Sequence, residues 1–239
     1  IVVTIWNAFP RSMNKYATVI GAGISGLSSA HRLLDEGYSV TLLSEQLPLE
    51  TVSCTACAFW YPYLVEPQEK AAQWGMDTFK RFAEDHKEKA AGVMQVSLLS
   101  VFEHEITDPL WSTEVPEYRR VPESELPNRY QDGFRFTTYM VEMPMYLPYL
   151  FESFKRRGGM FMQHRVTDVS SLIDDAGIVV NCTGLAAKDL CNDTDLTPIR
   201  GQVLSVANPG IDEIFFDTEN VIYIVPRSHD CFLGGTAQE

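Results

Sequence analysis

The residues best suited to chemistry lie near the start of the chain, in the hexapeptide Gly21-Ala22-Gly23-Ile24-Ser25-Gly26. In this spacing the first glycine allows a tight turn, the second lets a pyrophosphate approach the backbone, and the third lets a helix pack closely on a strand. The free N–H groups at the start of such a helix attract anions. The hexapeptide therefore predicts a site for the phosphates of a dinucleotide.

The elements around this hexapeptide follow the order that a dinucleotide site needs. An apolar run at 17–20 favours a buried parallel strand, a helix is predicted from Ile24 to about Glu36, and a second strand covers 38–43. Glu45 comes next, where a carboxylate can accept hydrogen bonds from ribose hydroxyls and would repel a 2′-phosphate. The order favours dinucleotide binding over an empty βαβ unit. NAD and FAD share the ADP half, so both stay open at this point.

Composition narrows the class of protein. The chain has 239 residues, of which 45% are apolar, so it can bury the core of one large domain or two smaller ones. Its net charge of −13 disfavours nucleic acid and anionic membranes as partners, and no apolar stretch is long enough to span a bilayer. The five cysteines form no dense framework, which favours a reducing compartment. Residues 1–12, which precede Met13, do not resemble a signal peptide and are expected to be loosely ordered.

After Glu45 the pattern leaves the regular alternation of strands and helices that an NAD-dependent dehydrogenase would continue. Helices are predicted at Gln68 to about Lys89, from Pro144 or Met145 to about Arg157, and at Leu185–Cys191; strands are predicted at 93–102, 134–143, 160–166, 177–181, 199–206, 214–217, 221–225 and 231–233. We predict an α/β protein in which a Rossmann-like nucleotide domain, residues 13–58 and 145–199, is interleaved with a mainly antiparallel β-sheet domain, residues 59–144 and 200–239.

Several stretches along the chain resemble the D-amino-acid oxidase family of FAD-dependent enzymes. They are Val19-Ile20-Gly21-Ala22-Gly23-Ile24-Ser25-Gly26-Leu27-Ser28, Trp60-Tyr61-Pro62-Tyr63, Asn181-Cys182-Thr183-Gly184-Leu185-Ala186, Arg200-Gly201-Gln202, Tyr223-Ile224-Val225-Pro226 and Leu233-Gly234-Gly235-Thr236. The resemblance covers nearly all of the chain from Tyr16 onward. It implies FAD as the cofactor and oxidative deamination of D-amino acids, by hydride transfer from the α-carbon to flavin N5, to 2-oxo acids with ammonia and hydrogen peroxide.

The same resemblance implies roles for individual residues. Gly21 to Gly26 and Thr183 would contact the pyrophosphate, and Glu45 and Gln46 would contact the adenosine ribose. Val52 and Ser53 would contact the phosphates or the ribityl chain, and Val166 would lie on the adenine side. Cys57, Ala58 and Phe59 would lie along the isoalloxazine. Gly184 follows Thr183 at the carboxyl end of a predicted strand, where ligands bind in such sheets. The Tyr223 hydroxyl would bind the substrate carboxylate.

Some residues depart from the family pattern. Ala58 stands where the family usually has glycine, and Glu219 and Asn220 occupy the region of its lid tyrosine. The family's carboxylate-binding arginine and its His-Asn-Tyr-Gly segment would follow Glu239, so we expect the chain as printed not to turn over D-amino acids unless Arg200 or Arg227 replaces that arginine. The rival functions are an NAD-dependent dehydrogenase and a non-catalytic nucleotide-binding fragment.

Other residues are given no chemical role. Cys54 and Cys57 form a CxxC without a second ligand pair at metal spacing, so no metal is predicted. No histidine is assigned as a base, because hydride transfer requires orientation rather than a side-chain base. The expected partners are a D-amino acid and dioxygen, with a homodimer compatible with the family, in the cytoplasm or peroxisome.

Overall fold

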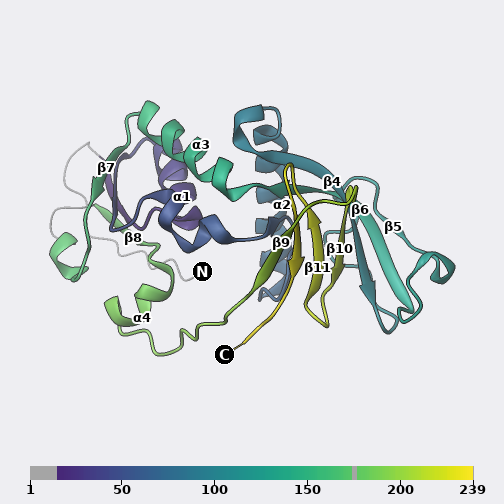
Figure 1. Ribbon diagram of the computed structural model, residues 1–239. Helices are drawn as coiled ribbons and strands as arrows, with labels where there is room; N and C mark the ends of the chain where they lie inside the picture. Colours follow the sequence, from purple (N-terminus) through teal and green to yellow (C-terminus); the bar gives the residue numbers. More distant parts are fainter. Residues whose placement is uncertain (1–14, 174–176, 239) are drawn as a thin grey trace. The chain divides into compact units, whose positions relative to one another are not determined.

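The computed structural model describes residues 15–173 and 177–238 (Figure 1). The chain divides into two compact units, each built from two separated segments. The first, here called the parallel-sheet unit, comprises the described parts of Ile1–Ala56 and Met143–Pro198. The second, the mixed-sheet unit, comprises those of Cys57–Glu142 and Ile199–Glu239. The predicted α/β fold class is confirmed. The leader predicted at residues 1–12 lies outside the described residues.

The parallel-sheet unit contains a four-stranded sheet in the order β7-β2-β1-β8, with every neighbouring pair parallel. Its strands are β1 (Tyr16–Ile20), β2 (Ser39–Ser44), β7 (Met160–Gln163) and β8 (Ile178–Asn181). Its helices are α1 (Ile24–Asp35), α3 (Met143–Arg156) and α4 (Ala187–Leu190), with short 3₁₀ turns at Pro48–Glu50, Val52–Thr55, Ser170–Leu172 and Gly184–Ala186. Parallel strands buried by helices read as apolar runs, which is why β1 was readable from the sequence.

Helices α1 and α3 are joined by a hydrogen-bonded histidine. His31 is buried, and its Nε2 donates to the carbonyl oxygen of Leu150 at 2.8 Å. A carbonyl can only accept, so the proton lies on Nε2 and Nδ1 accepts from Arg157 Nη1 at 3.0 Å. Arg157 Nη2 also donates to Asp35 at 2.6 Å. This chain of contacts fixes how the two helices pack.

The mixed-sheet unit contains an eight-stranded sheet, in which β3-β6-β4-β10-β11-β12-β9 are successive neighbours and β5 pairs with β6. In the described part of this sheet only β4 and β10 pair in parallel, so the sheet is mainly antiparallel. Its strands are β3 (Ala58–Phe59), β4 (Val93–Phe102), β5 (Arg119–Arg120), β6 (Asp132–Val141), β9 (Val203–Val206), β10 (Glu213–Asp217), β11 (Ile222–Pro226) and β12 (Cys231–Gly234). Helix α2 (Gln68–Asp85) and 3₁₀ turns at Lys89–Ala91 and Glu123–Glu125 complete the unit.

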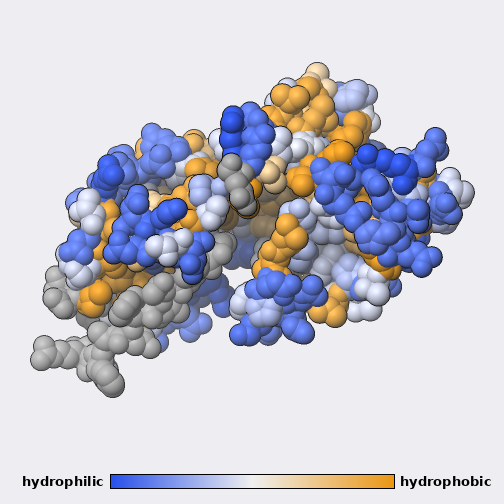
Figure 2. Space-filling view, turned by 90° about the horizontal axis from the view of Figure 1, so that it is seen from below, coloured by the Kyte–Doolittle hydropathy of each residue, from blue (hydrophilic) through white to orange (hydrophobic). Residues whose placement is uncertain are grey.

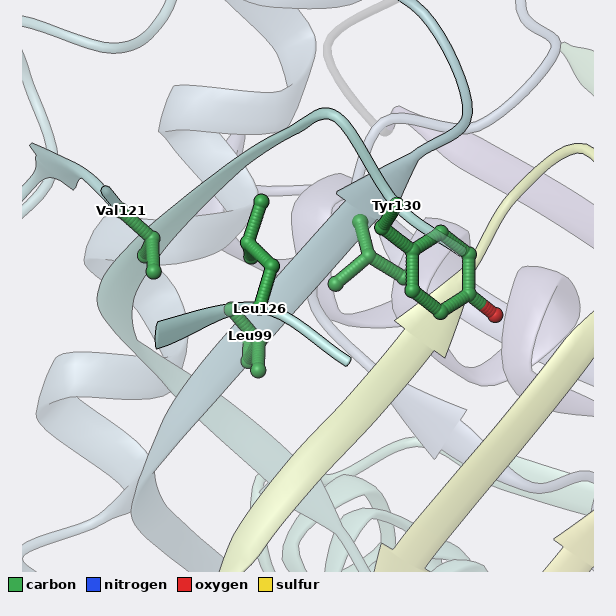
Figure 3. Close-up of a cluster of buried hydrophobic side chains, with 5 residues drawn as sticks. Leu99, Val121, Leu126 and Tyr130 are labelled. Carbon is green, nitrogen blue, oxygen red and sulfur yellow. The ribbon is translucent and has the colours of Figure 1, made fainter. Parts of the chain in front are cut away.

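The core of this unit lies on one face of the sheet, where alternate residues of β4, β6 and β10 point. Its fully buried side chains include Leu98, Phe134, Phe136, Met140 and Ile214. Helix α2 covers part of this core through Phe79, whose ring meets Trp60 at 4.9 Å and Tyr139 at 4.9 Å between centroids. A smaller cluster on the opposite face joins Leu99, Val101, Val121, Leu126 and Tyr130 (Figure 3).

Several predicted elements are shorter in the structure: β9 covers Val203–Val206 rather than 199–206 and α4 covers Ala187–Leu190 rather than Leu185–Cys191, and β7 and α2 also end early. Strand β7 stops at Gln163 rather than Val166, because Gln163 pairs with Ser44, the last residue of its partner β2. Helix α2 stops at Asp85 rather than Lys89, where the N–H groups of Lys87 and Glu88 bond three residues back in tight turns. The end of β7 therefore depends on its partner strand and that of α2 on local turns, and residue propensity predicts neither boundary to the residue.

The visible surface is mostly polar. Figure 2 shows hydrophilic residues over much of the visible face, with apolar residues gathered in smaller patches between them. Within residues 15–173 and 177–238, no helix combines the length and apolar composition that a membrane span requires.

The contact between α1 and α3 can be tested with Arg157→Met. This change removes the donor to His31 Nδ1 and the ion pair with Asp35, so we expect the free energy of unfolding to fall by about 1 kcal/mol. Chemical denaturation measures the loss. Arg156→Met is the matched control, because Arg156 is exposed and has no side-chain partner among the described residues. An equal effect of the two substitutions would contradict a specific role for Arg157.

Candidate functional site

The turn between β1 and α1 can be built only with glycines. Gly21 has φ +105°, which L side chains rarely adopt, and its N–H donates to Leu43 O at 2.7 Å. A Cβ on Gly21 would overlap the carbonyl of Cys182, and one on Gly26 would overlap the carbonyl oxygen of Gly21. The helix therefore starts in direct contact with the end of the strand.

This turn presents unpaired N–H groups. The N–H of Ala22 donates to Ser44 Oγ at 3.2 Å, and that of Ile24 to Ser53 Oγ at 3.0 Å. In the described part of the chain, the N–H groups of Gly23, Ser25 and Gly26 have no protein acceptor. Three donors at the positive end of α1 thus remain for an anion.

Glu45 lies directly after β2, at the carboxyl end of the parallel sheet. Among the described residues its exposed carboxylate pairs only with Arg165, at 3.6 Å, and such an exposed pair adds little stability. Its carbonyl oxygen accepts from Gln163 Nε2 at 3.0 Å, which fixes the backbone. Gln46 is also exposed, and its carbonyl oxygen accepts from Ser44 Oγ at 2.8 Å. The Glu45 carboxylate is therefore free to accept hydrogen bonds from hydroxyl groups.

Ser44 connects the glycine turn to the segment that contains Glu45 and Gln46. The sequence analysis assigned it no role. Its buried hydroxyl accepts from Ala22 and donates to Gln46. Nothing in the apolar run of β2 marks a terminal serine as different from an ordinary strand residue.

The carboxyl end of β8 lies against the same turn. Thr183 Oγ1 donates to Asn181 Oδ1 at 2.8 Å, and the Thr183 N–H donates to the same oxygen at 3.2 Å. Asn181 is thereby a support for Thr183, a role that the sequence analysis missed. Gly184 follows with φ +59° and is exposed.

The remaining predicted residues of this unit are placed less tightly. Val166 is half-buried just beyond β7, while Val52 is 82% exposed at the start of its 3₁₀ turn. The structure thus brings Ser53 and Thr183 to the glycine turn and places Glu45 at the same edge of the sheet. Within the part of the chain that the structure describes, Val52 makes no contact that would identify a role.

In the mixed-sheet unit, the segment from Cys57 to Tyr63 runs over strands β10 and β11. The ring of Phe216 meets those of Phe59, Tyr61 and Tyr63 at centroid distances of 5.3, 5.0 and 5.6 Å, and that of Tyr223 at 6.3 Å. These five side chains are here called the aromatic face. No local pattern distinguishes Phe216 from Phe215, whose ring packs on the opposite side against Tyr130.

One hydroxyl of the aromatic face is available. The Tyr61 hydroxyl bonds Ser100 Oγ at 3.3 Å and that of Tyr63 donates to Thr218 O at 3.3 Å. The Tyr223 hydroxyl has no hydrogen-bond partner in the part of the chain that the structure describes. Burial raises the pKa of Tyr223, and the nearby Cys57 raises it further, so its phenol is protonated at neutral pH and can donate.

The ring of Tyr223 is held by close backbone packing. A Cβ on either Gly234 or Gly235 would overlap this ring, so only glycines allow the approach. These residues belong to the Leu-Gly-Gly-Thr stretch at the end of β12. The orientation of Tyr223 is therefore set by β12 as well as by its own strand.

Cys57, Ala58 and Phe59 lie together at the edge of the mixed sheet. Ala58 and Phe59 pair with Val141 and Met140 of β6. Burial raises the pKa of the Cys57 thiol to about 12, and Arg227 only partly opposes this, so the thiol is neutral. Within residues 15–173 and 177–238, no group of three His, Cys, Asp or Glu side chains could hold a metal ion.

Arg227 is already engaged within its own unit. Its Nε donates to Asp230 at 2.8 Å, and its guanidinium lies 4.0 Å from the Phe232 ring centroid. Arg200 forms a backbone bridge with Gln238 beside the last described strand. Neither contact identifies a carboxylate-binding arginine.

Taken by themselves, these features define a class of protein. The three free N–H groups at α1, the glycine contacts and the exposed Glu45 fit the pyrophosphate and ribose of a dinucleotide. The aromatic face of the second unit, with one available phenol donor, has the mix of aromatic rings and few polar groups that is common in small-molecule sites.

Comparison with known proteins identifies the family. The model of the DAO family, FAD-dependent oxidoreductases, matches residues 17–239. The chain is 39% identical over 227 residues to a D-amino-acid oxidase of Rubrobacter xylanophilus, covering 93% of this chain and 70% of the relative. It is 36% identical over 232 residues to the D-aspartate oxidase of Homo sapiens, covering 92% of this chain and 68% of the relative. The chain belongs to the DAO family, and it is an enzyme with FAD as its cofactor.

A solved structure gives independent support for the fold. The glycine oxidase of Bacillus cereus superposes with a TM-score of 0.73 at 18% identity, covering 94% of this chain and 72% of that protein. At this identity the likeness concerns the fold alone. The chain spans 65–70% of the length of the three curated relatives from Rubrobacter xylanophilus, Dictyostelium discoideum and Homo sapiens.

Gly26→Ala tests the contact between helix and turn. The added Cβ would overlap Gly21 O, so α1 must move away from β1, and we expect at least a tenfold loss of FAD affinity, consistent with about 1–3 kcal/mol for overpacking. Titration of the apoprotein with FAD, followed by flavin fluorescence, measures it. Gly201→Ala is the control, since its Cβ would meet only Thr236 O at an ordinary 3.6 Å. Wild-type affinity in Gly26→Ala would show that the contact is dispensable.

Proposed function

We propose that the protein oxidises D-amino acids to 2-oxo acids, with release of ammonia and hydrogen peroxide. The observation that carries this proposal is Tyr223, a protonated phenol whose hydroxyl is available on the aromatic face. Such a group suits recognition of a carboxylate, the part that all amino acid substrates share.

The relatives support this choice of substrate. Those from Rubrobacter xylanophilus and Dictyostelium discoideum are named D-amino-acid oxidases, at 39% and 33% identity, and the human one is named a D-aspartate oxidase. The family's dependence on FAD argues against an NAD-dependent dehydrogenase. The names include both neutral and acidic substrates, so the proposal concerns D-amino acids as a class.

We assign the cofactor contacts as follows within this proposal. The parallel-sheet unit acts as the FAD-binding domain and the mixed-sheet unit as the substrate domain. The proposed contacts are the 21–26 turn, Ser53, Thr183 and Gly184 for the pyrophosphate; Glu45 and Gln46 for the ribose; Val52 for the ribityl chain or phosphates; Val166 for the adenine side; and Cys57, Ala58 and Phe59 for the flavin ring.

The chemistry divides between cofactor and protein. When bound, FAD accepts the hydride equivalent from the α-carbon and passes the two electrons to dioxygen, giving hydrogen peroxide. The Tyr223 phenol donates to the substrate carboxylate and so orients the α-carbon hydrogen. The aromatic face excludes water from that carboxylate, which strengthens the hydrogen bond. The substrate leaves as an imino acid, which water converts to a 2-oxo acid and ammonia.

The proposal is tested by assaying peroxide from the purified full-length protein supplemented with FAD. D-alanine, D-methionine and D-aspartate are compared with their L enantiomers and glycine. Peroxide with the D forms and little with the others supports the proposal. Peroxide release only with the L enantiomers or glycine would contradict the proposal and indicate an oxidase with a different substrate.

Glu45→Ala tests the ribose contact. The change removes an exposed carboxylate that accepts hydrogen bonds from hydroxyls, and we expect roughly a tenfold weaker Kd for FAD with no loss of folding. Flavin fluorescence titration measures Kd, and circular dichroism checks the fold. Glu36→Ala is the control, since Glu36 is also exposed but lies at the opposite end of α1. Equal FAD affinity in wild type and Glu45→Ala would remove Glu45 from the site.

Tyr223→Phe tests the carboxylate contact. Loss of one hydrogen bond to a charged group is expected to cost about 1.5–3 kcal/mol, or roughly ten- to a hundredfold in substrate binding. KM for several D-amino acids should rise while flavin content stays the same. Tyr38→Phe in the other unit is the control for removal of a phenol. Unchanged KM in Tyr223→Phe would make Tyr223 a packing residue.

A further inference from the structure

We propose that Asp217 is a positioning residue that holds the turn between β10 and β11 and thereby fixes Tyr223 for substrate binding. This inference rests on the proposed function, since it takes Tyr223 as the group that binds the substrate carboxylate. Asp217 itself does not contact substrate. Side chains alternate along β10, so Phe216 lies on the aromatic face and Asp217 on the opposite one, beside Tyr130.

The carboxylate of Asp217 is completely buried and fully hydrogen-bonded. Oδ2 accepts from Arg129 Nη2 at 2.6 Å, from the Tyr130 hydroxyl at 2.7 Å and from Asn220 Nδ2 at 2.9 Å. Oδ1 accepts the backbone N–H groups of Glu219 at 3.1 Å and Asn220 at 3.0 Å. Burial by itself would raise the pKa of this carboxyl, but bonds from Asn220, Tyr130 and Arg129 hold it below its ordinary value. The group is therefore charged at neutral pH.

The turn that Asp217 holds is strained. Val221 has φ +55°, a left-handed conformation that is rare for a β-branched residue and persists only where surrounding contacts impose it. Its carbonyl oxygen accepts from the Gly235 N–H at 2.6 Å. Tyr63 donates to the carbonyl oxygen of Thr218 in the same turn. Without the Asp217 bonds, the turn would relax toward ordinary backbone angles.

The turn is tied to a rigid part of the sheet. The Tyr130 ring belongs to the cluster of Leu99, Val101, Val121 and Leu126, and its hydroxyl points away from that cluster (Figure 3). Arg129 lies over the Tyr130 ring at 4.8 Å. Asp217 therefore connects a packed cluster on one face to the turn that precedes β11.

Tyr223 follows this turn closely. It is the second residue of β11 and pairs with Phe216, the residue before Asp217. A change in the path of residues 218–221 would shift the register or direction of β11 at Tyr223. A one-residue slip would place the phenol on the opposite face of the sheet.

The chain provides a matched control in Asp132. This second buried carboxylate also accepts from an arginine, Arg120, and from two backbone N–H groups, those of Ile106 and Gly133. It lies on β6, separated from β11 by β4 and β10. Asp132→Asn should therefore lower stability as Asp217→Asn does, without acting on Tyr223.

The experiment combines kinetics with a double-mutant cycle on the FAD-loaded full-length protein. The variants are Asp217→Asn, Asp132→Asn, Tyr223→Phe and the double variant of Asp217→Asn with Tyr223→Phe. KM and kcat are measured with D-alanine, the Kd of benzoate by flavin absorbance, and Tm by thermal melting. Benzoate offers a carboxylate without an amine, so its binding reports on the carboxylate contact without turnover.

We expect Asp217→Asn to raise KM and the benzoate Kd about tenfold with kcat little changed. In the Tyr223→Phe background, Asp217→Asn should change neither KM nor the benzoate Kd further, because Asp217 affects binding only by positioning the Tyr223 hydroxyl. Asp132→Asn should lower Tm and leave KM and Kd as in wild type. If Asp217→Asn does not fold, Asn220→Ala, which removes one donor, should shift KM and Kd in the same direction by less.

Equal effects of Asp217→Asn with and without the Tyr223 hydroxyl would overturn the proposal, as would an equal rise in KM from Asp132→Asn. A failure of the proposed function is distinguishable. Absence of D-amino acid turnover in wild type would reject that function, whereas the benzoate cycle would still decide whether Asp217 acts on Tyr223.

Discussion

The parallel-sheet unit depends on one close contact, between Gly26 of α1 and the carbonyl oxygen of Gly21. Because neither residue has a side chain, the first turn of α1 packs directly against the end of β1. The N–H groups of that first turn are therefore available to one anion at the helix N-terminus. Ser44 and Ser53 accept from the N–H groups of Ala22 and Ile24, which leaves those of Gly23, Ser25 and Gly26 without a protein acceptor among the described residues. The anion site is thus a consequence of backbone packing, and its donors need no basic side chain.

In the mixed-sheet unit, the proposed substrate face depends on the alternation of side chains along a single strand, β10. In β10, Phe216 supports the aromatic face while Phe215 and Asp217 belong to the opposite one. The apolar half of the strand thus organises the face proposed for substrate, and its polar end holds the turn. A strand that is only five residues long can serve both because successive side chains point to opposite sides.

The amino-acid sequence alone predicts those features of the fold that depend on a local pattern of residues. The strand, glycine turn and helix at 16–35 follow from apolar runs and glycine spacing, and the return of residues 177–181 to the parallel sheet follows from a second apolar run. Features that depend on distant partners were not accessible. Ser44, Asn181 and Phe216 look like ordinary strand residues until their partners are known, and His31 lies on the buried side of α1 only because α3 supplies Leu150 O and Arg157.

A buried carboxylate holds the turn at each end of β11, the strand that contains Tyr223. No local sequence pattern predicts either of these carboxylates. Asp217 holds the turn before β11, and Glu142 Oε1 accepts from the Ser228 N–H at 2.7 Å in the turn after it. A buried carboxylate is costly to desolvate and contributes little net stability even when fully bonded. Its advantage is geometric, since it imposes one conformation on the N–H groups that it accepts. With both turns held in this way and the Gly234-Gly235 backbone against its ring, Tyr223 has little freedom to leave the aromatic face.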